Sequence, residues 1–328
     1  MFIYDITKAA NINTGGRIVA IFFVSDTHLT VGSLESKSLF PRHLDRLPRK
    51  EAEELYERMR VGIDNAFESA TTHIAKQPKA DAIIHLGDVT GGYRESGCAH
   101  PLVRPLAEDC RNTLHAIAPT YFALGNHDVG YRHPGSLGRG ISVESIETCE
   151  EIFGDLYWAL KVNGTLFIGV CSSIIEYGGN EERIVKRART QHEFVGDTLG
   201  GGNEKWVFCI HNPFSSRFLA REIVPHLDRL GSVVCGEFHD PTTAKPLRAI
   251  TKMASPFFRG AKGKVLVKCL QKLRVCPSTA PLWWRGYGLL QAVEEHRELE
   301  YEEVFLPLPS RAPLPTASRL RSTVWMVR

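Results

Sequence analysis

Short apolar segments bounded by turn residues recur along the chain and indicate strands. Five of them are rich in Val, Ile and Phe and cover residues 17–24, 82–86, 120–124, 205–210 and 232–235. Runs of this length and composition are typical of buried strands. Another two, residues 156–162 and 165–171, are joined by Asn163-Gly164, which is a strong sequence signal for a β-hairpin.

Apolar positions at steps of three and four residues predict helices between these strands. The longest such stretch begins near Pro48 and ends before Pro78, and its apolar stripe is formed by Leu55, Met59, Ile63, Phe67, Ala70 and Ile74. Shorter helices are expected at residues 106–117, 190–199 and 216–230. Ser215 or Ser216 is a candidate cap for the last of these, and Pro225 should kink or shorten it. Helices that alternate with strands favour a layered α/β fold.

Polar residues follow each of the five segments that are rich in Val, Ile and Phe. The motifs read Asp26-Thr27-His28, Gly87-Asp88, Gly125-Asn126-His127-Asp128, His211-Asn212-Pro213 and Gly236-Glu237-Phe238-His239. In α/β sheets, residues just past the strand ends converge on ligand sites. Carboxylates, imidazoles and one amide are ligands of a hard or borderline metal pair. The pattern therefore indicates a metal-site protein, and hydrolysis is the expected chemistry.

The composition is that of an ordinary globular chain. Of its 328 residues, 43% are hydrophobic and 23% are charged, which allows a substantial core. The net charge of +3 is too small to point to a nucleic-acid or membrane partner. A basic cluster is formed by Lys262, Lys264, Lys268, Lys272 and Arg274. We interpret it as a solvated surface, and a nucleic-acid or phosphate-steering face is the alternative.

Eight cysteines follow no disulfide or zinc-ribbon spacing, so we expect buried, reduced thiols. The first residues contain no signal-type apolar core, and no apolar run is long enough to span a bilayer. Both features favour a cytoplasmic protein without a membrane anchor.

The order of the five motifs resembles that of the calcineurin-like metallophosphoesterase superfamily. The pattern of that family is D-x-H, G-D, G-N-H-[DE], a lone His and G-H-x-H, each at a strand end. The resemblance covers residues 17–305 and implies an α/β fold, a four-layer sandwich of two mixed β-sheets flanked by helices. Strand-like segments at residues 286–293 and 299–306 would complete the second sheet.

The resemblance also implies a single domain over residues 1–306. Inserts are expected near residues 30–50, 91–104 and 241–285, and these loops would set the substrate. Residues 307–328 contain four prolines and are expected to form a non-globular tail.

Two divalent metal ions are implied as cofactors. One ion would be held by Asp26, His28, Asp88 and His239. The second would share Asp88 and take Asn126, His211 and the residue at position 237. Such ions can grip a phosphate together and activate a hydroxide that attacks phosphorus in line.

Three further residues have implied roles beside the metal ligands. His127 would stabilise charge at phosphorus or protonate the leaving oxygen, with Asp128 orienting its ring. His85, inside a strand, is expected to be a hydrogen-bonded residue that supports the ligands.

Glu237 is the one departure from the pattern, because it occupies the place of the first His in the last motif. A carboxylate can bind the second ion, but it lowers the net charge of the site by one unit. This should raise the pKa of a bridging water and favour harder ions. We therefore expect Mn²⁺, with Fe, Mg²⁺, Ni²⁺ or Zn²⁺ as alternatives, and a mildly alkaline optimum.

The expected activity is hydrolysis of a small-molecule phosphate ester by a phosphodiesterase or phosphatase. The alternative is a non-catalytic scaffold on the same fold, with Glu237 marking a degraded second metal site. A nucleic-acid enzyme is a third possibility that rests on the basic cluster alone.

Overall fold

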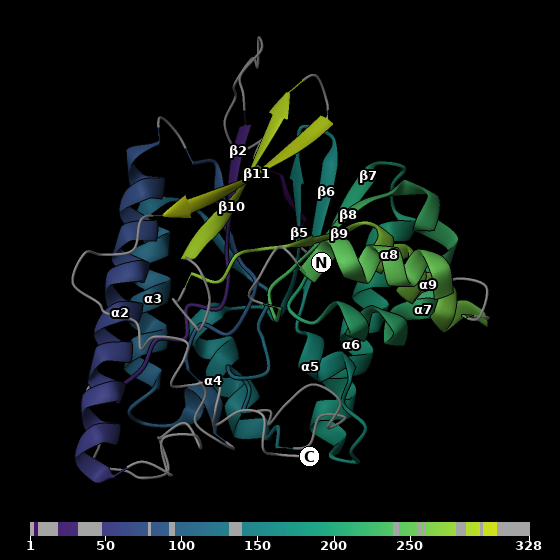
Figure 1. Ribbon diagram of the computed structural model, residues 1–328. Coiled ribbons are helices and arrows are strands. Elements are labelled where there is room, and N and C mark those ends of the chain that lie inside the picture. The colour runs from purple at the N-terminus through teal and green to yellow at the C-terminus, as the bar shows by residue number, and fades with distance from the viewer. Residues whose placement is uncertain are drawn as a thin grey trace.

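A computed structural model provides the fold (Figure 1). It describes residues 3–5, 19–31, 48–77, 80–91, 96–130, 140–238, 243–254, 258, 260–279, 287–295 and 298–306. The expected tail at 307–328, most of the expected insert at 30–50 and His239 lie outside these residues.

Two mixed β-sheets form the centre of the molecule. The first has the order β11-β10-β2-β3-β4, from strands β11 (Glu298–Leu306), β10 (Tyr287–Glu295), β2 (Val19–Val24), β3 (Ala82–His85) and β4 (Thr120–Phe122). The second has the order β1-β5-β6-β7-β8-β9, from strands β1 (Ile3–Asp5), β5 (Tyr157–Val162), β6 (Thr165–Val170), β7 (Lys205–Ile210), β8 (Leu230–Cys235) and β9 (Leu273–Val275). Within each sheet, the strands that precede the five motifs run parallel to one another, so the motifs gather at one end.

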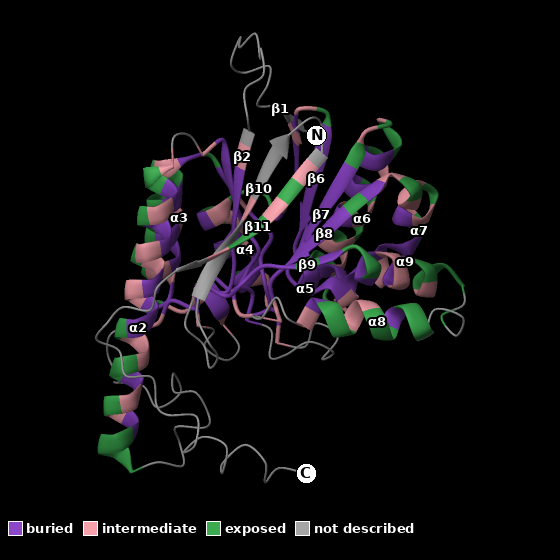
Figure 2. Cartoon of the chain, turned by 45° about the horizontal axis from the view of Figure 1, so that its top comes forward, coloured by how far each residue is buried: buried purple, intermediate pink, exposed green. Residues whose placement is uncertain are grey.

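Helices cover the outer face of each sheet. The first sheet is covered by α2 (Arg49–Lys76), α3 (Arg104–Ile117) and α4 (Val143–Phe153). The second is covered by α6 (Glu182–Gly200), α7 (Ala220–Ile223), α8 (Ala244–Ala254) and α9 (Gly260–Gln271). Short helices α5 (Ser172–Ile175), η3 (Gly97–Ala99), η4 (Pro213–Leu219) and η5 (Val224–Arg229) complete the described elements. Figure 2 shows the buried positions concentrated along both sheets, with exposed positions on the outer helix faces.

The alternation along β2 explains the layering. Phe22 and Val24 pack on the helices, whereas Ile21 and Phe23 pack on the second sheet. Successive side chains of a strand point to opposite faces, so one strand contributes to two apolar layers. The expected four-layer sandwich is confirmed.

The last two strands are placed differently from the expectation. β10 pairs antiparallel with β2, for example Leu290 opposite Phe23, so the hairpin extends the first sheet. The prediction that it completes the second sheet was wrong. Local alternation defines a strand, but it carries no information about which sheet has an open edge.

Two other segments also differ from expectation. The predicted helix at 216–230 is divided into η4, α7 and η5, and Pro225 lies inside η5. Its first turn is capped by Asn212, whose side-chain oxygen accepts from the Phe214 N–H at 3.0 Å, and not by Ser215 or Ser216. Residues 241–285 are not simply an insert, because β9 pairs parallel with β8.

All eight cysteines are buried and none forms a disulfide, as expected. Among the helices that the structure describes, none has the length and hydropathy needed to cross a membrane.

Candidate metal centre

The loops that carry the first two motifs lie side by side. Backbone N–H groups of Asp26 and His28 donate to the carbonyls of Gly87 and Asp88, each at 3.0 Å. This continues the β2–β3 pairing past the strand ends. The two motifs are therefore fixed against each other by main-chain hydrogen bonds.

An unusual backbone conformation marks most of the predicted ligands. Five non-glycine residues in the described part of the chain have positive φ, and four of them are Asp26, His28, Asp88 and Glu237, at 46° to 53°. The fifth, Asn163, is in the hairpin turn predicted from Asn163-Gly164. Left-handed conformations are costly for residues with a Cβ and tend to cluster at functional sites. Glu237 therefore shares its backbone geometry with three residues that match the family pattern.

One carboxylate oxygen lies at the centre of the site. The Oδ2 atom of Asp88 is 3.3 Å from Nε2 of His211 and 3.8 Å from Nε2 of both His28 and His127. Two groups of potential ligand residues can be defined, and within each group the ligand atoms lie within 4.8 Å of one another. The first group is His28, Asp88 and His127, and the second is Asp26, Asp88 and His211. Asp88 belongs to both groups, which is the arrangement expected of a bridging ligand. Nε2 of His28 also lies 3.8 Å from Oδ1 of Asp26, and Nε2 of His211 lies 3.0 Å from Oε2 of Glu237, which are pairs predicted for the first and second ion.

Burial separates the ligands from the predicted catalytic histidine. Asp26, His28, Asp88, Asn126 and His211 are all buried. The side chain of His127 is 35% exposed, and its ring meets that of His28 edge-on with centroids 5.1 Å apart. The imidazole of His127 therefore lies on the open side of the site, where a substrate could reach it.

His211 has its protonation pattern fixed by three neighbours. Its Nδ1 lies 2.7 Å from the backbone carbonyl of Leu86, which can only accept, so Nδ1 carries the proton. Its Nε2 then faces Oε2 of Glu237 at 3.0 Å and Oδ2 of Asp88 at 3.3 Å. A buried lone pair directed at two carboxylate oxygens is repulsive unless a cation lies there. In the metal-free chain that cation is a proton: burial favours neutral His211, but the two carboxylates outweigh it and hold the pKa well above its usual value.

The donor set fits divalent ions for a second reason. The Oδ1 atom of Asn126 is buried and has no hydrogen-bond partner within the described part of the chain. The pKa of Asp88 lies well below its usual value, because the neighbouring histidines outweigh the burial that would favour its neutral form. Carboxylate, amide and imidazole donors around one shared oxygen suit Mn, Fe, Ni or Zn, and these ions can bind without a thiolate ligand.

Asp128 does not have the predicted role. Its fully buried carboxylate accepts from the backbone N–H groups of Asp88, Val89, Thr90 and Gly125, at 2.8 to 3.3 Å. It therefore does not orient the His127 ring through its carboxylate and instead holds the Gly87-Asp88 and Gly125-Asn126 turns together. Burial, aided by the nearby Asp88, raises its pKa to about 7, while the N–H donors act in the opposite direction.

Close packing leaves no room for a side chain at two glycines of the motifs. A Cβ on Gly125 would lie 2.2 Å from Oδ1 of Asp88. A Cβ on Gly236 would lie 2.1 Å from Oγ of Ser25 and 3.0 Å from Oδ2 of Asp26. Both glycines therefore allow the carboxylate ligands to approach the neighbouring turn.

His85 supports the site as predicted. It is fully buried, its Nδ1 accepts from the Gly87 N–H at 3.1 Å, and its Nε2 lies 3.1 Å from Oγ1 of Thr27. Because Thr27 donates its own proton to the carbonyl of Val89, Nε2–H of His85 is the donor in the second contact. The neutral ring thus bridges the first two motifs.

Three supporting residues were not predicted. Ser25 Oγ donates to Oδ2 of Asp26 at 2.5 Å, Ser278 Oγ donates to the carbonyl of Asp26 at 3.1 Å, and the N–H of Thr279 donates to the carbonyl of Ser25 at 2.8 Å. Ser278 and Thr279 follow β9, about 250 residues away in sequence. Nothing in their sequence surroundings connects them with the first motif.

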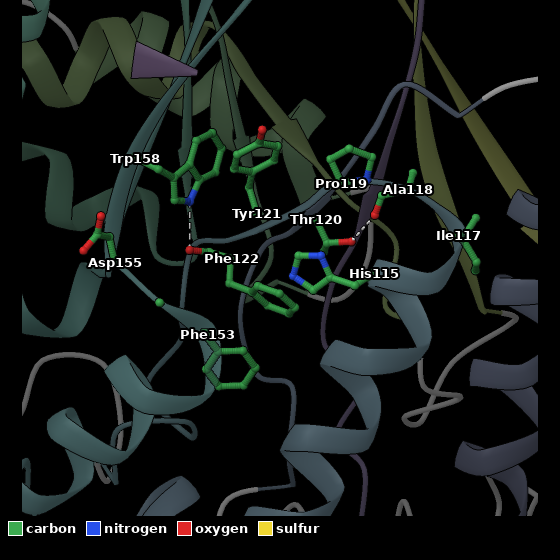
Figure 3. A pocket seen from close by; sticks show the side chains of 11 residues that line it. His115, Ile117, Ala118, Pro119, Thr120, Tyr121, Phe122, Phe153, Asp155 and Trp158 are labelled. Carbon is green, nitrogen blue, oxygen red and sulfur yellow. Dashed lines mark hydrogen bonds between the residues drawn. The ribbon is translucent and has the colours of Figure 1, made fainter. Parts of the chain in front are cut away.

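A pocket of about 640 Å³ lies elsewhere, along β4 and the end of α4 (Figure 3). Its aromatic lining includes Tyr121, Phe122, Phe153 and Trp158, and the indole Nε1 of Trp158 donates to the Phe122 carbonyl at 2.9 Å. None of the predicted metal ligands lines it. The chemistry is therefore expected past the end of β4 and not in this pocket.

A two-sheet α/β sandwich with paired Asp/His groups at the strand ends defines a metal-dependent phosphoesterase fold. The profile of the calcineurin-like phosphoesterase family matches residues 19–241, and the chain belongs to that family. The match includes every predicted ligand, His239 among them.

Similar solved structures are distant in sequence. A dimetal phosphatase from Danio rerio is 10% identical, with a TM-score of 0.48, and the match covers 88% of this chain and 96% of that one. A Vps29 double mutant from Entamoeba histolytica is also 10% identical, with a TM-score of 0.28, and the match covers 88% of this chain and all of that one. No curated protein matches the chain.

Proposed function

We propose that this protein hydrolyses a small-molecule phosphate ester and requires two divalent cations, with Mn²⁺ preferred. The observation that carries the proposal is the buried Nε2 of His211 between two carboxylate oxygens. That arrangement needs a positive charge at its centre, and Asp88 is shared with a second group of donors. Membership of the calcineurin-like phosphoesterase family supports the same chemistry.

The residues would divide the work by position. Asp26, His28, Asp88, Asn126, His211, Glu237 and His239 would hold the ions. When bound, two such ions polarise phosphate oxygens and lower the pKa of water. His127, on the open side, would place its Nε2 against the phosphate and donate a hydrogen bond or a proton to the leaving oxygen. Asp128 would keep the turn that carries His127 in register with Asp88.

Glu237 supports the choice of ion. Three carboxylates around two divalent ions leave a lower net charge than two, which favours a harder ion such as Mn²⁺ over Zn²⁺. The same lower charge leaves the pKa of an attacking water higher, so the activity optimum should be mildly alkaline.

A non-catalytic scaffold is the competing function. Left-handed backbone at four ligand positions, Glu237 included, costs about 1–3 kcal/mol at each. A site that no longer binds metal would not be expected to keep this strain. The partly exposed His127 forms no described ring hydrogen bond within 3.5 Å, and its Nε2 lies 3.8 Å from Asp88 on the open side of the site, which suits a residue that contacts a substrate. We therefore favour catalysis. Eight buried cysteines without a disulfide support a reducing compartment such as the cytoplasm.

The decisive experiment compares bis-p-nitrophenyl phosphate with p-nitrophenyl phosphate as substrates of the purified chain. We expect hydrolysis with added Mn²⁺, none with a chelator, and none for Asp88→Asn with Mn²⁺. Asp155→Asn, an exposed carboxylate away from the ligands, is the matched control and should retain full activity. The ratio of the two rates separates a diesterase from a monoesterase. Mn²⁺ binding without hydrolysis of either ester would favour the scaffold.

A further inference from the structure

The charges of the chain are strongly segregated along the sequence. Residues 241–293 contain ten Lys and Arg and no Asp or Glu. The rest of the chain has 30 Lys and Arg against 37 acidic residues. The small net charge therefore conceals one basic region on an otherwise acidic protein, and that region forms α8, α9 and β9.

Helix α8 has an apolar stripe on its solvent side. Ala244, Leu247 and Thr251 face the protein. Pro246, Ala249, Ile250 and Met253, at steps of three and four, are all exposed, with Ile250 at 57% and Met253 at 71%. These are the two most exposed large apolar side chains in the described part of the chain. Soluble helices normally place polar residues on this face.

Cations flank the stripe. Lys245 and Lys252 are exposed and lie about two helical turns apart along one edge of α8. Neither Lys245 nor Lys252 forms an ion pair within the described part of the chain. Their charges are therefore available to an external partner.

Helix α9 extends the same surface. Helix α9 packs against α8. The backbone of Phe258 lies against Gly263 of α9, because a Cβ on Gly263 would be 2.7 Å from the carbonyl carbon of Phe258. The Phe258 residue is 41% exposed. Lys262 and Lys264, one on each side of Gly263, are exposed. We call Pro246, Ala249, Ile250, Met253 and Phe258, with Lys245, Lys252, Lys262 and Lys264, the α8–α9 surface.

We propose that the α8–α9 surface binds the face of an anionic lipid membrane. Exposed Ile, Met and Phe can enter the acyl boundary while Lys side chains on the same elements reach acidic headgroups. The complementarity is one of charge and of hydrophobicity together. This mode lays a helix on the membrane and needs no spanning segment.

Two other occupants fit less well. A nucleic acid would use the cations and aromatic rings, but it offers no apolar phase for Ile250 and Met253. A second copy of the chain would bring the same lysines into a shared interface without a single acidic residue from residues 241–293 to neutralise them. Anionic lipid satisfies both parts of the surface.

The test is co-sedimentation of the full chain with vesicles. Phosphatidylcholine vesicles are compared with three-to-one phosphatidylcholine–phosphatidylglycerol vesicles, at low and high salt. We expect binding to the anionic vesicles at low salt only. Lys245→Glu with Lys252→Glu should lower the partition coefficient at least about fivefold per cation. Ile250→Ser with Met253→Ser should lower it about tenfold.

Matched controls come from α2. Val61→Ser removes an apolar side chain that is 40% exposed, and Lys50→Glu reverses an exposed charge. Both should bind vesicles as the unaltered chain does, and thermal unfolding should show all variants folded. Hydrolysis of a soluble ester should be unchanged in every variant, so the result does not depend on the proposed function.

Several results would overturn the proposal. The first is absence of binding to anionic vesicles, and the second is binding that the α8 variants leave intact. Salt-sensitive binding to an RNA oligonucleotide without vesicle binding would assign the surface to nucleic acid. A dimer in light scattering that dissociates in the Ile250→Ser, Met253→Ser variant would assign it to self-association.

Discussion

The imidazole Nε2 of His211 lies 3.0 Å from the carboxylate Oε2 of Glu237, and both atoms are buried. The contact joins the fourth motif to the only position that departs from the family pattern. Because Nδ1 of His211 is committed to the Leu86 carbonyl, Nε2 and Glu237 face the same cation. Glu237 is thus placed to be a ligand.

Replacing Glu237 with Gln removes a charge and keeps the size of the side chain. We expect Mn²⁺ to bind at least about tenfold more weakly, as measured by isothermal titration calorimetry, because a ligand or close neighbour of the ion is neutralised. An affinity equal to that of the unaltered chain would place Glu237 outside the coordination sphere.

Replacing Glu237 with His restores the residue of the family pattern. The site then regains one unit of positive charge, so the preference should move from Mn²⁺ toward Zn²⁺ and the optimum of the pH–rate profile should fall. Metal analysis and the profile check this directly. If neither quantity changes, the charge argument fails.

Asp128→Asn tests the backbone acceptor. The carboxylate accepts hydrogen bonds from backbone N–H groups, whereas the NH₂ group of Asn would face some of these N–H groups as a second donor. Those buried N–H groups would then lose their acceptor. We expect a loss of about 3 kcal/mol in the free energy of unfolding, measured in urea, together with weaker Mn²⁺ binding. Asp155→Asn is the control and should change the free energy of unfolding by less than about 0.5 kcal/mol. A stable, inactive Asp128→Asn variant would instead indicate a direct role in chemistry.

His85 should make the protein sensitive to mild acid. Burial, with the nearby His211 charge, lowers the pKa of His85 to about 3, well below its unfolded value. Between these pKa values His85 binds a proton in the unfolded chain but not in the folded chain. The free energy of unfolding therefore falls as the pH decreases from about 6.5 toward 3. Between pH 7 and pH 5, this residue should cost about 2 kcal/mol.

Urea unfolding of metal-free protein at the two pH values measures the effect. His85→Gln keeps a donor and an acceptor in the core but does not titrate. Its stability should depend on pH less than that of the unaltered chain, by the same amount. Equal pH dependence in the two proteins would show that His85 is protonated in the folded state or is not a major contributor.

Gly125→Ala tests the close approach of the second and third motifs. The added methyl would lie 2.2 Å from Oδ1 of Asp88 and must displace the carboxylate. We expect loss of Mn²⁺ binding and a fall in activity of at least about a hundredfold. Gly200→Ala, at the end of α6 with open space at its Cβ, should retain both. Normal Mn²⁺ binding by Gly125→Ala would indicate that the turn can relax.

How much of this site could be predicted depends on how local each signal is. Asp26 and Asp88 are recognisable because each directly follows an apolar run, and the end of a parallel strand fixes where the next side chain lies. The role of Asp128 was not visible, because its donors include Val89 and Thr90, which are 39 and 38 residues away. A carboxylate that binds four backbone groups leaves no sequence pattern.

The same reasoning explains the errors in the fold. The helix over residues 216–230 was predicted from apolar spacing, but Pro213 and Pro225 remove backbone donors and divide it into short turns. Ser278 supports Asp26 through a contact that no local pattern encodes. Long-range pairing is decided by which apolar surfaces remain uncovered after the local elements have formed.

The pairing of β2 has a consequence for synthesis of the chain. The strand that delivers Asp26 has β3 on one side and β10 on the other, and residues 290–294 supply the second partner. A ribosome that has made all five motifs but not residues 290–294 has therefore produced a sheet with an open apolar edge. Nascent chains truncated before residue 290 should aggregate through that edge, and only a chain that includes residues 290–294 can close it.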